Sequence, residues 1–153
     1  MGIHPLPHQR ADASCSQAGK QVPRVDRRRA LGRHGEKLAE AHLARLGFRA
    51  LARNVRTRAG EIDLIAFDGE TLVFAEVKTL RVRAGTTRPG ADQQPLQWLR
   101  HRQRARLRRL AVAWLSDDSH LRPTARTIRF DAIGVTVDAA DRLVRLEHIE
   151  GAW

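Results

Sequence analysis

Residues 60–80, GEIDLIAFDGETLVFAEVKTL, decide the fold of this chain. The stretch predicts two apolar strands joined at an Asp-Gly dipeptide, which is a strong short-range signal for a β-hairpin. Three charged residues, Asp63, Glu76 and Lys78, nevertheless sit among Ile, Leu, Val and Phe. Buried charge is costly unless it is paired or binds a metal ion. These three residues therefore mark a candidate functional site within the best strands of the sequence.

The two strands are expected at Glu61–Phe67 and Thr71–Thr79, and their register determines how the charges meet. A two-residue loop makes Glu76 the diagonal neighbour of Asp63, whereas a four-residue loop places the two residues directly opposite each other. In both registers Asp63, Glu76 and Lys78 project from one face, because side chains alternate between the faces of a strand. Directly opposite Cβ atoms lie roughly 5 Å apart and diagonal ones roughly 7–8 Å. Either separation lets two carboxylates bind one cation.

Two adjacent carboxylates repel each other, and a divalent ion between them removes the repulsion. Ligands that are all oxygen suit Mg²⁺ or Mn²⁺, with coordination positions left for water and phosphate oxygens. Lys78 lies one strand repeat beyond Glu76 and could orient a water molecule or stabilise developing negative charge. The competing interpretation is an ion pair between Lys78 and either carboxylate on an exposed face of the sheet.

The composition indicates the kind of partner. The chain has 153 residues and a formal net charge of +11, which favours a polyanion such as nucleic acid or an anionic membrane surface. A solvated, Arg-rich surface without a partner would give the same composition. The single Cys excludes an internal disulfide and a Cys-based metal site. Without an apolar run of roughly 18 residues or an apolar leader, the expected location is the cytoplasm, with no membrane span.

The rest of the chain predicts one α/β domain, with a mixed central sheet flanked by helices, over residues 30–153. Residues 1–29 are rich in Pro and polar side chains and end in three Arg, which indicates a disordered basic tail. The expected elements are a helix at Leu31–Leu46, a strand at Phe48–Arg56, the two hairpin strands, a helix at Leu96–Leu115, and strands at Ile128–Val137 and Arg142–Ile149.

The expected second helix carries both a polar residue on its inward face and a dense set of cations. Gln103 falls between Leu99 and Leu107 at helical spacing, so its amide either supports an active site on the sheet or ends the apolar stripe in solvent. Six Arg lie between positions 100 and 109. They form either a solvated face or a phosphate-binding flank. The candidate nucleic-acid contacts on this helix are Arg100, Arg104 and Arg108.

The two strand motifs together resemble those of the YraN-like family of small bacterial proteins, which belongs by similarity to the PD-(D/E)XK nuclease superfamily, near the archaeal Holliday junction resolvases. The resemblance covers roughly residues 30–150. It is carried by Gly60-Glu61-Ile62-Asp63-Leu64-Ile65-Ala66 and Phe74-Ala75-Glu76-Val77-Lys78, with Gly35-Glu36, Arg53-Asn54 and Arg129-Phe130-Asp131 elsewhere in the chain.

The resemblance implies a restriction-endonuclease-like α-β-β-β-α-β core and assigns roles to residues. Asp63 matches the metal-binding Asp of the superfamily, Glu76 and Lys78 match the acid and lysine of its second motif, and Glu36 matches a helix acid that serves as a further metal ligand. Gln103 stands where the family usually carries a lysine.

The implied function is Mg²⁺- or Mn²⁺-dependent hydrolysis of phosphodiesters in branched or structured DNA, with a homodimer as a possible assembly. The alternative is a nucleic-acid-binding module that retains the nuclease fold without catalysis.

Overall fold

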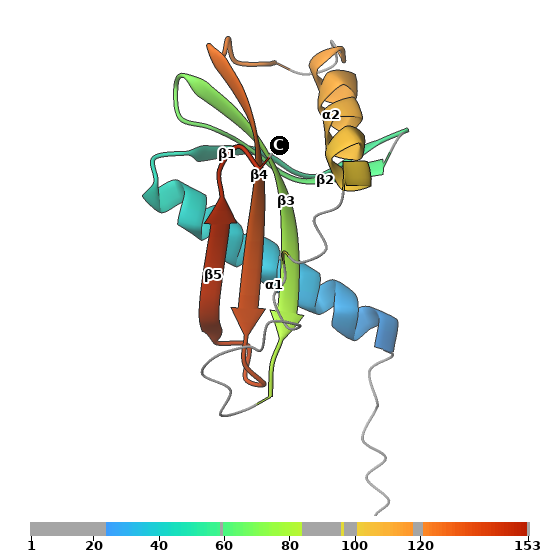
Figure 1. The fold of residues 1–153 in the computed structure, drawn as a ribbon, viewed down its shortest axis with the longest axis vertical. Helices are drawn as coiled ribbons and strands as arrows, with labels where there is room; N and C mark the ends of the chain where they lie inside the picture. The colour runs from blue at the N-terminus through green and yellow to red at the C-terminus, as the bar shows by residue number, and fades with distance from the viewer. Residues whose placement is uncertain (1–23, 59, 84–95, 97–100, 118–120, 153) are drawn as a thin grey trace, which may run out of the picture.

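The structure is a computed structural model, and it describes residues 24–58, 60–83, 96, 101–117 and 121–152. A five-stranded mixed sheet forms its centre, in the spatial order β1-β2-β3-β4-β5 (Figure 1). The elements are α1 Arg24–Arg45, β1 Arg49–Thr57, β2 Gly60–Phe67, β3 Thr71–Arg81, α2 His101–Leu115, β4 Thr127–Val137 and β5 Leu143–Ile149. No helix among the described residues is long and apolar enough to span a bilayer.

The sheet follows from two kinds of connection. Tight turns join neighbouring strands that pair antiparallel, as between β1 and β2, β2 and β3, and β4 and β5. β3 and β4 pair in parallel, so the chain must cross over between them, and α2 lies in that crossover. The predicted α/β class with a mixed central sheet is confirmed, and the arrangement is consistent with a restriction-endonuclease-like core.

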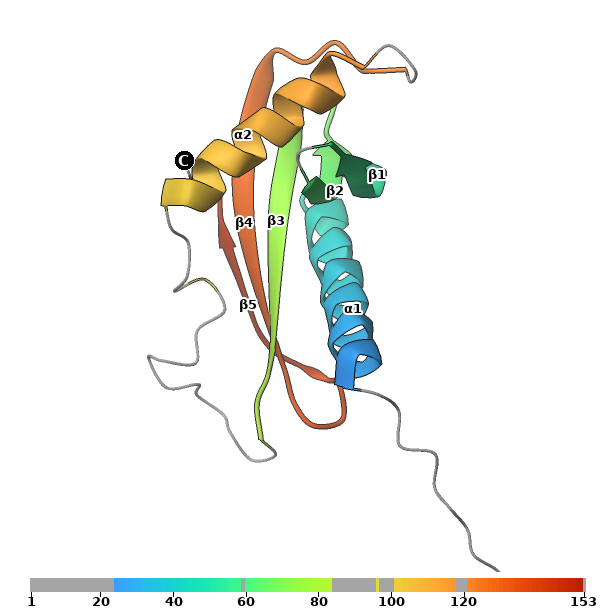
Figure 2. The same cartoon turned by 90° about the vertical axis from the view of Figure 1, so that its right-hand side faces the viewer.

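Alternation along the strands divides the core between two faces. Val73 and Ala75 of β3 belong to a cluster with Ala39 and Leu43 of α1. Leu72 and Phe74 point the other way and join Leu107, Leu110 and Trp114 of α2 in a second cluster. The two helices therefore cover opposite faces of the sheet, as the view along the sheet shows (Figure 2).

The β2–β3 hairpin adopts the register with a four-residue loop. Phe67 pairs with Leu72, and the Asp68 side chain accepts hydrogen bonds from the backbone N–H groups of Glu70 and Thr71, at 2.9 and 2.7 Å. Gly69 has a φ of 112°, a conformation that favours glycine. Continued beyond its last pair, this register brings Asp63 opposite Glu76, which is one of the two arrangements that the sequence allowed.

The boundaries of two elements differ from those predicted. α1 begins at Arg24 rather than Leu31, so residues 24–29 of the predicted tail are helical, with Asp26 in the first turn, where a negative charge is favourable. Leu96, the predicted start of the second helix, lies in a turn, and that helix is described from His101. Residues 1–23 and 97–100 lie outside the described residues.

Candidate functional site

The site is centred on Asp63, at the point where β2 separates from β3. The last pair of the β2–β3 ladder is Leu64 with Ala75. The next β3 amide on this side of the strand, the N–H of Val77, donates to Asp63 Oδ2 at 2.7 Å. A side-chain carboxylate thus takes the position of a ladder carbonyl. Asp63 is held by backbone rather than by an ion pair, so one of its oxygens is fixed without neutralising its charge.

The carboxyl group of Asp63 has a clearly raised pKa. Burial, and next the negative charge of Glu76, raise the pKa of the Asp63 carboxyl to about 6 from an ordinary 3.8. The hydrogen bond from Val77 and the charge of Lys78 oppose this rise in pKa, whereas Glu36 adds to it. Acids from β3 and α1 therefore both act on the carboxylate of β2. A cation placed at Asp63 would remove the penalty.

Glu76 and Lys78 form the ion pair that the competing interpretation of the sequence anticipated. Lys78 Nζ donates to Glu76 Oε1 at 2.5 Å. The face is not an exposed one, however, because the Glu76 side chain is only 8% exposed while that of Lys78 is 39% exposed. Lys78 thus compensates a buried carboxylate and still reaches solvent, where a substrate could meet it.

Glu36 reaches the site because a glycine lets α1 approach the sheet closely. A Cβ on Gly35 would lie 1.8 Å from Thr79 Oγ1 of β3, so no larger residue fits at this crossing. Asn54 of β1 then donates from Nδ2 to Glu36 Oε2 at 2.9 Å, and it does so from a φ of 50°, which is unusual inside a strand. One helical turn further along, Arg53 binds Glu40. The Arg53-Asn54 dipeptide therefore fixes β1 to α1 and orients Glu36.

A cleft of about 630 Å³ opens beside Asp63. It lies between the first half of α1, the C-terminal end of β1 and the N-terminal end of β2. Three acids and three arginines line it together with a glycine and an asparagine: Glu36, Glu61, Asp63, Arg29, Arg33, Arg56, Gly32 and Asn54. Sequence reasoning missed Arg33, Asn54, Arg56 and Glu61 as functional candidates and left Arg29 in the tail. The helical spacing of Arg29, Arg33 and Glu36 was the signal that could have shown the two arginines on one face.

The chemistry of the three carboxylates fits a hard divalent ion. Asp63, Glu76 and Glu36 supply only carboxylate oxygens, as Mg²⁺ and Mn²⁺ prefer, and mutual repulsion acts on Asp63. In the described part of the chain, no three His, Cys, Asp or Glu side chains already converge as a metal-binding group. Binding would therefore require side-chain rotation, above all of Glu76 away from Lys78.

The predicted contacts on α2 are only partly described. Arg100 lies outside the described residues, and so do the side chains of Gln103 and Arg104, although their backbone is helical. Arg108 is exposed on α2 and is not among the residues that line the cleft. The arginines that line the cleft beside Asp63 come from α1 and β1 instead.

Comparison with known proteins identifies the family. The profile described as "Uncharacterised protein family UPF0102" matches residues 35–135, a span that contains Glu36, Asp63, Glu76 and Lys78. The chain belongs to this family. A UPF0102 protein of Frankia casuarinae is 44% identical over 124 residues, which cover 81% of this chain and 96% of the relative. Another, of Geobacter sulfurreducens, is 42% identical over 123 residues, which cover 80% and 88%. The family predicted from the strand motifs is confirmed.

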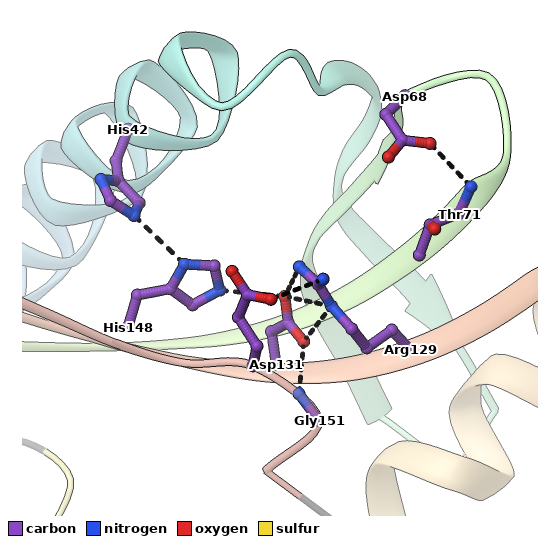
Figure 3. A network of polar contacts seen from close by, with 8 residues as sticks. His42, Asp68, Thr71, Arg129, Asp131, His148 and Gly151 are labelled. Carbon is purple, nitrogen blue, oxygen red and sulfur yellow. Dashed lines mark hydrogen bonds and ion pairs between the residues drawn. The ribbon is translucent and has the colours of Figure 1, made fainter.

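Asp131, part of another motif of the resemblance, does not join the site. Its carboxylate is fully buried and accepts hydrogen bonds from Arg129, His148 Nε2 at 2.9 Å and the N–H of Gly151 at 3.0 Å (Figure 3). His148 Nδ1 in turn lies 3.1 Å from His42 Nε2 on α1. The bonds from His148 and Gly151 to Asp131 join β5 and residue 151 to β4, and the His42–His148 contact joins β5 to α1. In this UPF0102 chain Asp131 therefore stabilises the fold.

Proposed function

We propose that this protein is a metal-dependent nuclease that hydrolyses phosphodiester bonds in structured DNA. One observation carries the proposal: a partly buried Asp63, with its pKa raised by burial and by Glu76, borders a cleft that also contains arginines. A carboxylate kept under repulsion is poorly explained as a stabilising element, and groups with strongly shifted pKa values concentrate at functional sites. Membership of an uncharacterised family leaves the activity open.

Each residue has a separate role in the proposed reaction. Asp63, Glu76 and Glu36 would hold Mg²⁺ or Mn²⁺, which when bound supplies an acidified water and neutralises charge on the phosphate. Lys78, released from Glu76, would donate a hydrogen bond to the attacking water or to the phosphoryl oxygen. The water oxygen forms the new bond to phosphorus and gives up a proton to solvent, the ester P–O bond breaks, and the leaving oxygen takes up a proton from solvent. Asn54 holds Glu36 toward the cleft.

A nucleic-acid-binding module without catalysis is the second candidate. The Lys78–Glu76 bond favours it, because that pair alone accounts for a buried glutamate and an adjacent lysine. The two candidates share the cleft and its arginines and differ in whether the acids bind metal. A cytoplasmic location and a homodimer remain predictions from the sequence.

Cleavage of a panel of labelled linear and branched DNA, with Mg²⁺, with Mn²⁺ and with EDTA, tests the proposal. Lys78→Ala should reduce the cleavage rate by roughly 10²–10⁴-fold, the usual worth of a positioned group that acts in the transition state, and should leave metal binding largely intact. Arg109→Ala, on the exposed face of α2, is the matched control for loss of one positive charge. Absence of metal-dependent cleavage of every substrate by the wild type would leave the binding module as the function.

A further inference from the structure

A second cleft lies next to the first, on the other side of the C-terminal end of β1. It has a volume of about 650 Å³ and is lined by Val55, Arg56, Thr57, Arg58, Ala113, Trp114 and Asp117. Arg56 lines both clefts, so the cleft beside Asp63 and the cleft beside α2 border the same side chain. A chain-like ligand in the first cleft would meet the second one next.

The arginines along this route are exposed and carry uncompensated charge. Within the described chain, no carboxylate forms an ion pair with Arg29, Arg33 or Arg56. Some arginines elsewhere are paired, such as Arg53 with Glu40 and Arg129 with Asp131. Guanidinium groups that are free and face one cleft are suited to phosphate oxygens, which they bind in a fork geometry.

The second cleft differs from the first in its chemistry. Val55, Ala113 and the buried Trp114, whose ring packs edge-to-face on Phe74 at 5.6 Å between centroids, give it an apolar floor. Arg56 and Arg58 line it with two cations, and Asp117 adds one carboxylate. An apolar floor beside two cations fits a nucleobase with its own phosphate. Bases inside a duplex are stacked on their neighbours, so an unpaired nucleotide is the form that can enter.

We propose that one nucleic-acid strand runs from the cleft at Asp63 past Arg56 into the second cleft, where an unpaired base lies against Val55 and Ala113. Arg29, Arg33 and Arg56 hold the phosphates of this strand. The inference rests on the proposed function and specifies its substrate: DNA with an unpaired nucleotide next to the bond presented to Asp63. It also moves the main phosphate contacts from α2 to α1 and β1.

The test measures binding without catalysis, by fluorescence anisotropy of the full chain in EDTA. The probes are a blunt duplex and the same duplex with a short single-stranded tail. The wild type should bind the tailed probe about 10-fold more tightly, as burial of roughly 55 Å² of apolar surface would provide. Ala113→Trp fills the second cleft from an exposed helical position and should abolish this preference while leaving the blunt duplex unaffected. Val112→Trp, on the outer face of the same helix and 62% exposed, is the matched control and should keep the preference.

Two further substitutions keep the test decisive if Ala113→Trp folds poorly. Arg58→Glu touches only the second cleft and should also remove the preference for the tail, whereas Arg33→Ala should weaken binding of both probes more than Arg108→Ala does. A tail preference that survives both Ala113→Trp and Arg58→Glu, or phosphate binding that depends on Arg108 and not on Arg33, overturns the inference. Metal-dependent cleavage without any tail preference refutes this inference alone. A tail preference without cleavage refutes the nuclease and leaves the strand path standing.

Discussion

Replacing Asp63 with Asn should stabilise the metal-free protein at pH 7. Asn is isosteric with Asp, and its Oδ1 can still accept the hydrogen bond from the Val77 N–H, so the substitution removes charge and little else. The pKa of the carboxyl rises from 3.8 to about 6 on folding. At 1.36 kcal/mol per pKa unit this difference costs about 3 kcal/mol of folding free energy at neutral pH. Screening by water at a partly buried group reduces the expected gain to roughly 1–3 kcal/mol.

The sign of the effect depends on pH in a defined window. Well below pH 3.8 Asp63 is protonated in both the folded and the unfolded state, so its charge costs nothing. As pH rises from about 4 to about 6 the unfolded state loses the proton first, and the wild type loses stability relative to Asp63→Asn. Well above pH 6, where the folded state has also lost the proton, the difference is constant. Urea unfolding in EDTA, at intervals from pH 3 to pH 8, measures this curve for both proteins.

Addition of Mg²⁺ or Mn²⁺ should reverse the order. An ion that binds only the folded state stabilises it by about 2.7 kcal/mol at 100 times its dissociation constant, and only the wild type retains the carboxylate. The opposite outcome in EDTA, a clear loss of stability in Asp63→Asn at pH 7, would refute the reasoning. It would mean that the Asp63 charge is compensated by Lys78, and the site would then be an ion-pair network.

Three further substitutions test how the site and the fold are held. Gly35→Ala should destabilise the protein by roughly 1–3 kcal/mol or more in urea unfolding, because the new Cβ overlaps the Thr79 side chain at the α1–β3 crossing. Asn54→Ala removes the bond to Glu36 and should weaken Mn²⁺ binding, followed by calorimetry, by roughly 10-fold, as expected for loss of a group that orients a ligand. Unchanged affinity would show that Glu36 does not contribute to the site. Asp131→Ala should cost roughly 3–5 kcal/mol of stability, since it leaves Arg129 without its buried partner, and should not alter metal binding in whatever fraction remains folded.

The hairpin was predictable because its signals are local. The Asp-Gly turn and the alternation of side chains predicted both strands, which the structure confirms, and a shared face for Asp63, Glu76 and Lys78, which stays a prediction. The choice between the two registers was not predictable, because it depends on the Asp68 side chain accepting two backbone hydrogen bonds across the loop. Such a bond stabilises one loop length over another without leaving a periodic pattern in the sequence.

The basic wall of the cleft was not predictable from pattern. The first turns of α1 contain Arg27, Arg28 and Arg29 with little apolar periodicity, and such a segment is typical of a solvated tail. The helix extends into it because the later turns pack on the sheet through Ala39 and Leu43, and elongation from an existing helix costs little. Arg29 thereby becomes part of the cleft.

The role of Asn54 could not be predicted from the sequence for a different reason. A positive φ inside a strand has no signature in a β-rich pattern, and the residue matters because it meets an acid from another element. The Asp131 network is equally nonlocal, since it joins β4 to β5, to the end of the chain and, through His148, to His42 on α1. In both cases the sequence identifies residues that resemble a family motif, and only the tertiary contacts separate a residue that orients the site from one that stabilises the fold.

The charge of the whole molecule and the charge of the site have opposite signs, and this contrast bears on function. The acids around Asp63 would repel a phosphodiester, yet the chain has a formal net charge of +11, and three arginines stand in the same cleft. A long-range positive field draws a polyanion toward the surface, while the acids act only over a few ångströms. A divalent ion at the acids would then turn the remaining local repulsion into attraction for a phosphate. Raising the salt concentration should therefore weaken DNA binding steeply and leave metal binding at the partly buried Asp63 much less affected.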